Sequence, residues 1–445
     1  MNTEILLDHE PVPGGYLVRG LLRITGQAPP AAERPALNLA LVLDRSGSMR
    51  AMRKLEHAKQ AATLLVRRLG EEDVVSIVAY DDEVRTVASR TPGSRREQLP
   101  DALAGLETGG MTNLSGGWLR GRGLVADTLV EGGVNRVLLL TDGLANVGVT
   151  EPGQLRDLVG SAAAKGVSTT TIGFGADYDE HLLTALAEAG GGSTYYIEHP
   201  DQAPAVFEAE IEGLMALAAQ NVAVTVSPGR AVEIAAVHHR YPTRSLDHGA
   251  LRLELGDLYA LEPKSLLVEL LVRDDVGAAG PNGRDADGAG AGPGALDRGS
   301  LDVATLVVEG YVLTETGVEQ RMVTLPVRVS PSEAGVVEPE VRREMLLLRA
   351  ARARDEALED RADGIPADGA RKLRDAARSI ADAGLADPEL DEEAEDLRRM
   401  AERFEDDVVT MADAKYMHQR AWARRTSRTS TADMISRVKR EEGED

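Results

Sequence analysis

The 445-residue chain is too long for one hydrophobic core, and its apolar content of 43% is that of a folded protein, so we expect two or three domains. Its 50 Lys and Arg against 73 Asp and Glu give a net charge of −23, which disfavours nucleic acid and anionic membranes as partners. The absence of cysteine excludes disulfides, thiol nucleophiles and cysteine-ligated metals. The N-terminus has no signal-peptide pattern and no apolar run could span a bilayer, so we expect a cytoplasmic protein without membrane insertion.

The first strands of the chain precede a long region in which strands and helices alternate. Residues 4–7 and 16–24 have strand patterns, and residues 27–34 form a connector rich in Pro and Ala. Over residues 37–219, short apolar strands alternate with amphipathic helices. This alternation predicts an α/β doubly wound, mostly parallel sheet.

The pattern changes in the second half of the chain. Residues 220–333 have a period of two, which predicts an antiparallel β-sandwich, with 276–300 as a flexible loop rich in Gly and Ala. We expect residues 1–34 to join this sandwich, so that the α/β domain is inserted into it. Residues 338–445 form a C-terminal α-helical region, predicted as helices over 342–362, 367–383, 391–425 and 431–441.

Oxygen-bearing side chains follow two predicted strands of the α/β region and fill one loop between its helices. The apolar strand LALVL ends at Asp44, followed by Ser46 and Ser48; Thr112 lies in the glycine-flanked loop GGMTNLSGG; Asp142 ends the strand VLLLT. Because ligands gather at the carboxyl ends of strands in a doubly wound sheet, we expect these side chains to converge. Carboxylates and hydroxyls are hard ligands that suit Mg²⁺, Mn²⁺ or Ca²⁺.

Each of these segments also has a simple structural interpretation. Ser48 is a candidate N-cap of the following helix, Thr112-Asn113 a candidate N-cap of the next, and Asp142-Gly143 a turn. The conjunction of all three, in order on one α/β topology, favours a metal site.

Together these residues resemble the von Willebrand factor type A domain family with its metal-ion-dependent adhesion site. Asp44, Ser46 and Ser48 match the family's Asp-x-Ser-x-Ser, and Thr112 and Asp142 match its threonine and second aspartate. The resemblance implies that Ser46, Ser48 and often Thr112 contact the metal, while Asp44 and Asp142 often act through water. The flanking regions are similar to bacterial members in which the A domain is embedded in a β-sandwich and followed by a helical tail.

Other polar clusters favour structural roles. Asp81-Asp82 ends a strand and is interpreted as a solvated turn, although a second metal shell is the alternative. His238 and His239 are expected on opposite faces of a strand, and the remaining histidines at the surface. The predicted helix over 391–425 carries an acidic cluster, which is interpreted as a solvated charged face; the alternative is that one of its carboxylates reaches the metal and inhibits ligand binding in cis. Its members are Glu392, Glu393, Glu395 and Asp396.

We therefore expect a divalent-metal-dependent protein-binding protein of the adhesion or scaffold type, not an enzyme. A partner's Asp or Glu carboxylate would complete the metal coordination. The alternative is a cofactor or substrate-recognition scaffold for an AAA-type ATPase, of the chelatase or MoxR kind. A metal-dependent hydrolase is less favoured, because a phosphatase of the haloacid-dehalogenase type needs a second Asp where this chain has Ser46. The sequence leaves open the partner, the metal, the oligomeric state and any regulation by the C-terminal helices.

Overall fold

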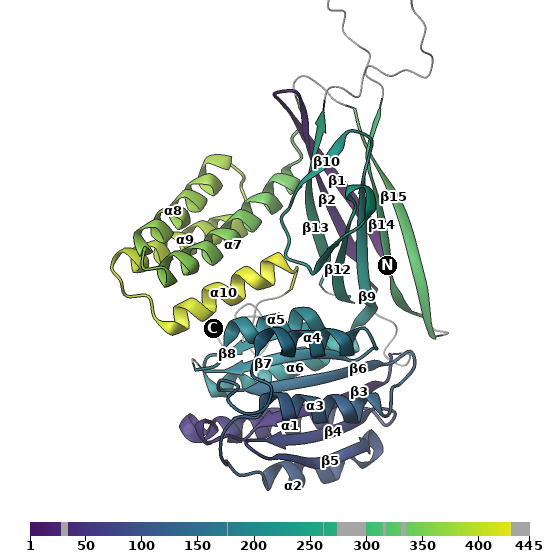
Figure 1. Cartoon of the computed structure of the whole chain (residues 1–445), viewed down its shortest axis with the longest axis vertical. Coiled ribbons are helices and arrows are strands. Elements are labelled where there is room, and N and C mark those ends of the chain that lie inside the picture. Colours follow the sequence, from purple (N-terminus) through teal and green to yellow (C-terminus); the bar gives the residue numbers. More distant parts are fainter. Residues whose placement is uncertain are drawn as a thin grey trace, which may run out of the picture.

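A computed structural model describes residues 1–27, 34–175, 177–260, 262–273, 300–314, 317–330 and 335–428. Figure 1 shows an α/β domain, a pair of β-sheets standing above it, and a group of helices at the side of the sheets. The predicted helix over 431–441 lies outside the described residues, as does the predicted loop over 276–300 apart from its last residue. Within the described residues, no helix is long and apolar enough to cross a membrane.

The α/β domain is built on a sheet with strand order β5-β4-β3-β6-β7-β8. Its strands are β3 (Leu37–Asp44), β4 (Val74–Tyr80), β5 (Val84–Pro92), β6 (Val134–Thr141), β7 (Ser168–Phe174) and β8 (Gly191–Ile197). All neighbouring strands are parallel except the edge pair β4 and β5, which is antiparallel. This confirms the predicted doubly wound, mostly parallel sheet.

Helices cover both faces of this sheet, because the strand residues point alternately to opposite sides. Leu39 and Leu41 pack with the core under α1, α2 and α6, whereas Ala40 and Val42 pack with the core under α3, α4 and α5. The helices are α1 (Lys54–Arg68), α2 (Leu99–Ala104), α3 (Leu114–Ala126), α4 (Pro152–Ala163), α5 (Glu180–Gly190) and α6 (Ala203–Met215), with short 3₁₀ helices η2 (Gly47–Arg53), η3 (Gly93–Gln98) and η4 (Pro200–Gln202). Central strand β3 is consequently apolar along its whole length up to Asp44, apart from Asn38.

Two antiparallel sheets form the sandwich, with orders β1-β2-β13-β10 and β11-β12-β9-β14-β15. Their bounds are β1 (Asn2–Val12), β2 (Gly15–Thr25), β9 (Leu217–Pro228), β10 (Val232–Val237), β11 (Thr243–Ser245), β12 (Leu251–Tyr259), β13 (Lys264–Arg273), β14 (Leu301–Thr314) and β15 (Gly317–Val329), with the 3₁₀ turn η5 (Asp247–Gly249). One apolar core lies between the sheets, filled by side chains such as Val18, Leu22, Val224 and Val268. Because β1 and β2 share a sheet with β13 and β10, the chain leaves the sandwich for the α/β domain and then returns to it.

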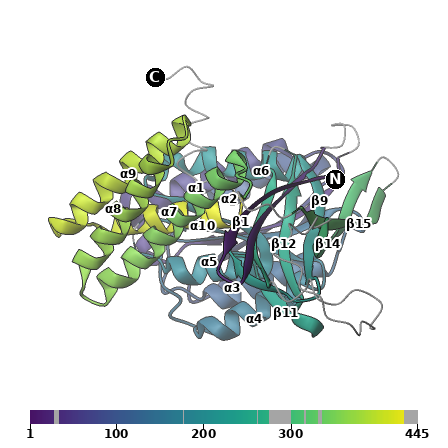
Figure 2. The ribbon, with the colours of Figure 1, turned by 90° about the horizontal axis from the view of Figure 1, so that it is seen from above.

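The C-terminal helices are α7 (Pro339–Ala362), α8 (Pro366–Ala383), α9 (Pro388–Glu405) and α10 (Met411–Arg425). They share an apolar core of their own. Figure 2 shows them on the side of the sandwich where β1 lies. Val341, Met345 and Leu348 of α7 pack on Leu21 and Leu267 of that sheet. The three structural classes predicted from the sequence are therefore all present.

Helix α10 joins the helical region to the α/β domain. The Lys415 ammonium donates to the Tyr178 carbonyl at 2.7 Å and pairs with Glu180 at 2.6 Å. His418 Nε2 lies 3.1 Å from Thr184 Oγ1 of α5, and burial lowers the pKa of His418 to about 4, assisted by the nearby His181. A neutral imidazole fits this buried contact between His418 and Thr184, since burial disfavours the imidazolium form.

Some predicted elements were wrong in detail. The predicted helix over 391–425 is two helices, separated by a turn in which Asp407 has a φ of +52°. A capping box between Thr410 and Asp413 starts the second helix, a signal present in the sequence. The predicted α/β region up to residue 219 extends slightly too far: its last helix, α6, ends at Met215, because the following apolar residues pair with β12 and β14.

Some histidines and acidic side chains differ from their predicted placement. His238 and His239, expected on opposite faces of a strand, lie beyond the end of β10 and are both buried, and His9 and His418, expected at the surface, are buried as well. In the acidic cluster of α9, Glu393 and Asp396 are also buried.

Arg354 explains that burial, since its guanidinium pairs with both carboxylates, at 2.7 Å in the case of Asp396. These two acidic side chains therefore stabilise the helical region from within, and they are not available to reach a metal in the α/β domain.

Candidate metal centre

Two strands that lie side by side in the sheet end in carboxylates. Asp44 is the last residue of β3, and Asp142 directly follows β6. The two strands pair in parallel, with Leu43 opposite Leu140. Both carboxylates therefore lie at the same carboxyl edge of the sheet, where open α/β sheets bind their ligands.

Asp44 is fully buried, and its two carboxylate oxygens have different donors. The Ser46 N–H donates to Oδ1 at 2.8 Å, and Thr141 Oγ1 donates to Oδ2 at 2.7 Å. Burial raises the pKa of Asp44 to about 6; the hydrogen bonds oppose that shift, while the nearby Asp142 carboxylate adds to it. Two buried carboxylates that face the same space repel each other, which a shared cation would relieve.

Asp142 is also buried and has partners from the loop after β3. Ser48 Oγ donates to its Oδ1 at 2.6 Å, and Ser46 Oγ lies 3.0 Å from Ser48 Oγ. The Lys54 ammonium donates to its Oδ2 at 2.8 Å, and both side chains of this ion pair are buried. The sequence reasoning missed Lys54, which is 88 residues away in the chain and has the appearance of an ordinary first residue of a helix.

Thr112 enters from the loop between α2 and α3. Its backbone N–H donates to Asn146 Oδ1 at 2.9 Å, which ties this loop to the one after β6. A Cβ atom on Gly143 would lie 3.5 Å from Thr112 Oγ1 and 3.7 Å from Ser48 Oγ. The two hydroxyls thus lie against the Asp142-Gly143 turn, and all five predicted site residues come together at one edge.

Asp81 holds two of these loops together. Its carboxylate accepts from the Arg45 guanidinium at 2.9 Å and from the Gly110 N–H at 3.0 Å, and its carbonyl accepts from the Asn113 N–H at 2.8 Å. The interpretation as a solvated turn was therefore wrong for Asp81, which is buried, although Asp82 is exposed. The feature that could have indicated this role of Asp81 is its position at the end of a strand that lies beside β3.

Of the two N-caps predicted beside the site, one is confirmed and the other is wrong. Asn113 caps α3, since its side chain accepts from the Gly116 N–H at 2.9 Å. Ser48 caps no helix: it lies inside η2, and α1 begins only after Met52 and Arg53, whose φ angles are +48° and +56°. The Ser48 hydroxyl is consequently free of a capping role and is used for Asp142.

The donor set fits a hard divalent cation. It brings together two carboxylates and three hydroxyls, which Mg²⁺, Mn²⁺ and Ca²⁺ prefer over softer metals. Elsewhere in the described part of the chain, no group of three or more His, Asp or Glu side chains has the arrangement of a metal site. The five-residue site is not a group of that kind, because it has only two carboxylates and its other three side chains are hydroxyls.

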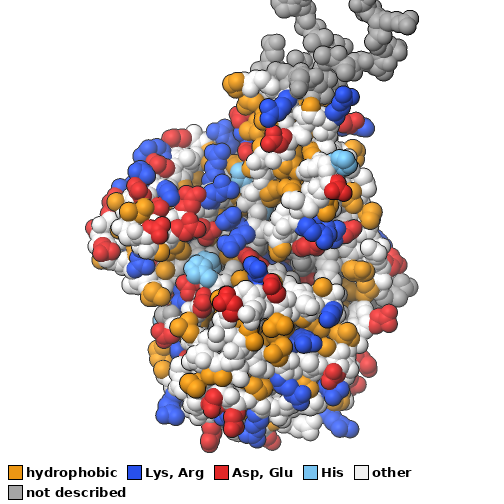
Figure 3. All heavy atoms as spheres, in the orientation of Figure 1, with side chains coloured by type: hydrophobic (Ala, Val, Ile, Leu, Met, Phe, Trp, Pro, Cys, Tyr) orange, Lys and Arg blue, Asp and Glu red, His pale blue; other side chains and the backbone are white. Residues whose placement is uncertain are grey.

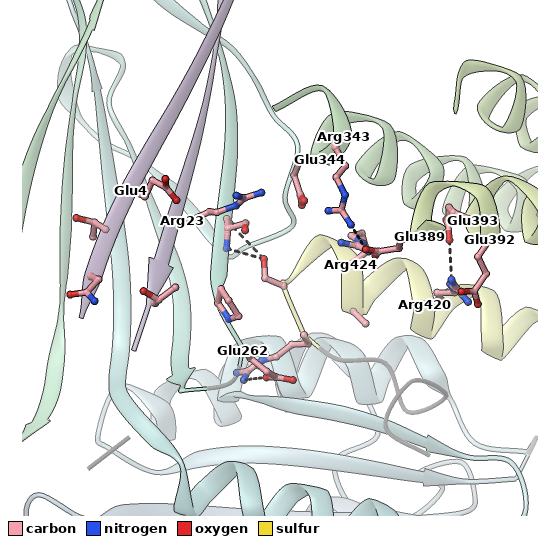
Figure 4. Close-up of a pocket in the computed structure, with 18 of the residues that line it drawn as sticks. Glu4, Arg23, Glu262, Arg343, Glu344, Glu389, Glu392, Glu393, Arg420 and Arg424 are labelled. Carbon is pink, nitrogen blue, oxygen red and sulfur yellow. Dashed lines mark hydrogen bonds and ion pairs between the residues drawn. The ribbon is translucent and has the colours of Figure 1, made fainter. Parts of the chain in front are cut away.

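A cleft lies between the sandwich and the C-terminal helices. This cleft of about 720 Å³ is lined by charged side chains, which gather between the sandwich and the helices in Figure 3. Arg343 and Arg424 both pair with Glu389, and Arg420 pairs with Glu393 at 3.1 Å, as Figure 4 shows. These ion pairs join α7, α9 and α10, so the charges serve to hold the helices together.

The fold and the strand-end loops define a doubly wound α/β domain with polar loops at the carboxyl edge of its sheet, and the family comparison identifies its class. Residues 38–209 match the family model of the von Willebrand factor type A domain. The chain therefore contains a von Willebrand factor type A (VWA) domain, inserted between strands of a β-sandwich.

Several proteins are similar to this chain in sequence. The chain is 29% identical over 242 residues to YfbK of Escherichia coli (strain K12), a match that covers 54% of this chain and 42% of YfbK. It is 28% identical over 257 residues to sll0103 of Synechocystis, covering 56% of this chain and 60% of that protein. Human inter-alpha-trypsin inhibitor heavy chain H3 is 32% identical over 158 residues, 34% of this chain and 18% of the heavy chain. The matches thus span less than two thirds of these relatives.

Two solved structures share the architecture well beyond the VWA domain. A von Willebrand factor type A protein from Catenulispora acidiphila superposes with a TM-score of 0.67 at 17% identity, covering 90% of this chain and 89% of the other. VWA2, the ArnB paralogue of Sulfolobus acidocaldarius, superposes with a TM-score of 0.57 at 14% identity, covering 96% and 99%. At these identities the likeness establishes the fold alone.

Proposed function

We propose that this protein binds a protein partner through a divalent cation held at the carboxyl edge of the VWA domain. VWA domains mediate protein–protein interaction, and neither the family model nor the relatives' names indicate a catalytic activity. The observation that carries the proposal is the convergence of Asp44, Ser46, Ser48, Thr112 and Asp142 at one edge of the sheet. When bound, the cation would supply an electrophilic centre for a carboxylate oxygen.

The charge of the site favours an anionic partner group. Asp44 and Asp142 contribute two negative charges, and Lys54 contributes one positive charge. With a divalent cation added, the formal charge is +2 − 2 + 1, or +1. Three neutral hydroxyls leave this charge uncompensated, so an Asp or Glu carboxylate from a partner would complete both the coordination and the charge balance.

A pull-down with the full chain tests the proposal. With Mg²⁺ present we expect a partner protein to be retained by the wild type, released by EDTA, and not retained by the Asp44→Ala variant. Asp82→Ala serves as the control, because Asp82 is an exposed carboxylate at the end of the neighbouring strand β4. A complex that survives EDTA would contradict the proposal. Retention of an AAA-type ATPase as the Mg²⁺-dependent partner would favour the scaffold alternative.

Lys54 is expected to set the affinity for the cation. In the Lys54→Met variant the buried Asp142 carboxylate loses its ion pair, which destabilises the metal-free protein by about 3 kcal/mol. The same loss removes a competing positive charge, so we expect Mg²⁺ to bind about tenfold more tightly. Calorimetric titration with Mg²⁺ measures the affinity, and urea denaturation measures the stability.

The matched control for Lys54 is Arg53→Met, which removes an exposed positive charge from the preceding residue. This variant should leave both the affinity for Mg²⁺ and the stability of the protein nearly unchanged. Weaker Mg²⁺ binding by Lys54→Met would show that the lysine supports the cation site and does not compete with it.

A further inference from the structure

Strand β15 is a long and open edge of the sandwich. Among the described strands it pairs with β14 alone, and Figures 1 and 2 show it on the side of the sandwich away from the C-terminal helices. Its pairing with β14 has no register shift from Val327 down to Gly317. A regular edge of this kind presents a row of backbone N–H and carbonyl groups to any strand that approaches it.

The other described sheet edges are short, bulged or covered. β11 has three residues, and β10 has six with a bulge between Ile234 and Ala236. The register of β5 with β4 shifts twice. β8 is contacted by β12 and α10, and β1 is bridged by Val336 through two hydrogen bonds with His9. Proteins protect their edge strands by such means, so β15 is the exception among the described strands.

The direction of the backbone groups in β15 follows from the neighbouring strands. The N–H of Gly229, directly after β9, donates to the Val303 carbonyl at 2.9 Å, so Val303 of β14 turns toward β9. The next residue, Ala304, therefore turns toward β15, where it pairs with Val327. Alternate residues of β15 consequently point away from β14. These are Val318, Gln320, Met322, Thr324 and Pro326.

Pro326 fits this assignment and limits the part of the edge that can pair. Proline has no backbone N–H, so a sheet tolerates it where that group would face away from the neighbouring strand. It also removes the donor that an added strand would use at this position. The edge that remains for pairing is residues 318–324.

The side chains of this edge complement a second copy of themselves. When two β15 strands run antiparallel with Gln320 opposite Gln320, Glu319 lies opposite Arg321 twice, and Val318 lies opposite Met322 twice. The opposed residues 318, 320 and 322 all turn their backbone groups outward, so each pair exchanges two hydrogen bonds. Glu319 and Arg321 are about half exposed, at 51% and 52%, and are free to change partners from their own contact of 3.3 Å. Opposite charges across a strand pair are stabilising.

Other symmetric registers of this edge are poorer. A pair centred on Met322 sets Val318 opposite Pro326, which has no N–H to donate, and sets Glu319 opposite Leu325. A pair centred on Thr324 sets Met322 opposite Pro326. The register centred on Gln320 is the one that avoids the proline and pairs the charges.

We propose that this protein forms a two-fold symmetric dimer in which two β15 strands pair antiparallel, with Gln320 at the two-fold axis. The pairing joins two five-stranded sheets into one continuous sheet. Symmetric dimers use the same surface on both subunits, as this self-complementary edge does. The dimer goes beyond the proposed function, because it needs no cation and carries two VWA domains in one particle.

An introduced cysteine tests the register. The chain has no cysteine of its own, so a single new thiol is followed without background. In the proposed dimer the two Gln320 Cα atoms lie about 5.5 Å apart, which a disulfide can span. We expect Gln320→Cys to form an interchain disulfide under mild oxidation, visible on a non-reducing gel at twice the chain mass of 47.5 kDa.

Tyr311→Cys is the matched control for this cross-link. Tyr311 is 43% exposed and lies opposite Gln320 on β14, one strand further from the axis. Its Cα atom would be about 14 Å from its copy, which is three strand spacings and too far for a disulfide. This variant should remain at the mass of a single chain.

Sedimentation velocity of the full chain over a concentration series measures the dimer directly. We expect the wild type to dimerise equally with Mg²⁺ and with EDTA. Glu319→Arg sets arginine opposite Arg321 at two places and should weaken the dimer about tenfold. The double exchange Glu319→Arg/Arg321→Glu restores opposite charges and should return the dissociation constant to within about twofold of the wild type.

A proline at the axis tests the backbone hydrogen bonds. Gln320→Pro removes the central donor and should give a monomer, whereas Gln320→Ala keeps the N–H and should remain a dimer. Since the Gln320 N–H points away from β14, the proline variant keeps its hydrogen bonds to β14, and urea denaturation checks that it is folded.

Three outcomes would overturn the proposed dimer. A wild type that sediments as a monomer at every concentration would mean that this edge is left for a strand of a different protein. A dimer that Glu319→Arg and Gln320→Pro both leave unchanged would use another surface. A dimer that forms with Mg²⁺ and dissociates in EDTA would place the contact at the metal edge.

Discussion

Replacing Asp44 with alanine is expected to abolish the stabilisation of the protein by Mg²⁺. The buried Asp44 carboxylate provides half of the negative charge of the site, and its removal leaves the Ser46 N–H and the Thr141 hydroxyl without their acceptor. A cation that binds only the folded state stabilises it by about 2.7 kcal/mol at 100 times its dissociation constant. Urea denaturation with and without Mg²⁺ should show this gain for the wild type and none for Asp44→Ala.

Two comparisons make the Asp44 result specific. Asp82→Ala removes a carboxylate from the end of the neighbouring strand and should keep the full Mg²⁺ response. Thr112→Ala keeps both site carboxylates, so it should retain Mg²⁺ binding and mainly weaken the binding of the carboxylate partner. If Asp44→Ala gains as much stability from Mg²⁺ as the wild type, the cation binds elsewhere and the proposed site is wrong.

Replacing Arg136 with methionine is expected to cause the largest loss of stability, about 3–5 kcal/mol. Arg136 is fully buried at the end of β6 that lies opposite the metal edge. Its guanidinium donates to Glu210 of α6 at 3.2 Å and to the Tyr259 hydroxyl at 2.7 Å, and it also pairs with Asp257 of β12. The variant would leave two buried carboxylates without their cation, at the contact between the VWA domain and the sandwich.

Urea denaturation of the Arg136→Met protein measures this loss, and a second variant identifies its cause. Adding Asp257→Asn to Arg136→Met removes one of the unpaired charges and should restore part of the lost stability. Arg156→Met, which removes an exposed arginine of α4, should change the stability by less than about 0.5 kcal/mol. Equal stability of Arg136→Met and Arg156→Met would show that the buried ion pairs contribute nothing net.

Arg136 also illustrates why the contact between the VWA domain and the sandwich could not be predicted from the sequence. Arg136 lies in the apolar strand VNRVLLL, where a single arginine is easily taken for a surface position at the strand's beginning. Its partners Glu210 and Asp257 are 74 and 121 residues away. Sequence periodicity reports which face of an element is apolar, and it carries no information on which distant charges meet.

The α/β architecture, the antiparallel sandwich, the helical region and the five residues proposed as the cation site can all be predicted from the amino-acid sequence. These depend on local patterns: strand alternation, helical spacing, and oxygen-bearing residues placed where strands end. The break between α9 and α10 also has a local signal, the capping box at Thr410, but the helical pattern of the sequence continues on both sides of it.

The charge of the site and the support of its loops depend on contacts between distant segments of the chain, which the sequence does not reveal. The fold brings the Lys54 ammonium to the Asp142 carboxylate and the Asp81 carboxylate to the Gly110 N–H, in the loop that carries Thr112. Each arrangement joins segments separated by long stretches of chain, and the geometry of the loops that join them depends on how the sheet and helices pack. The hard oxygen ligands of the proposed site were therefore visible in the sequence, whereas the positive charge of Lys54 beside them was not.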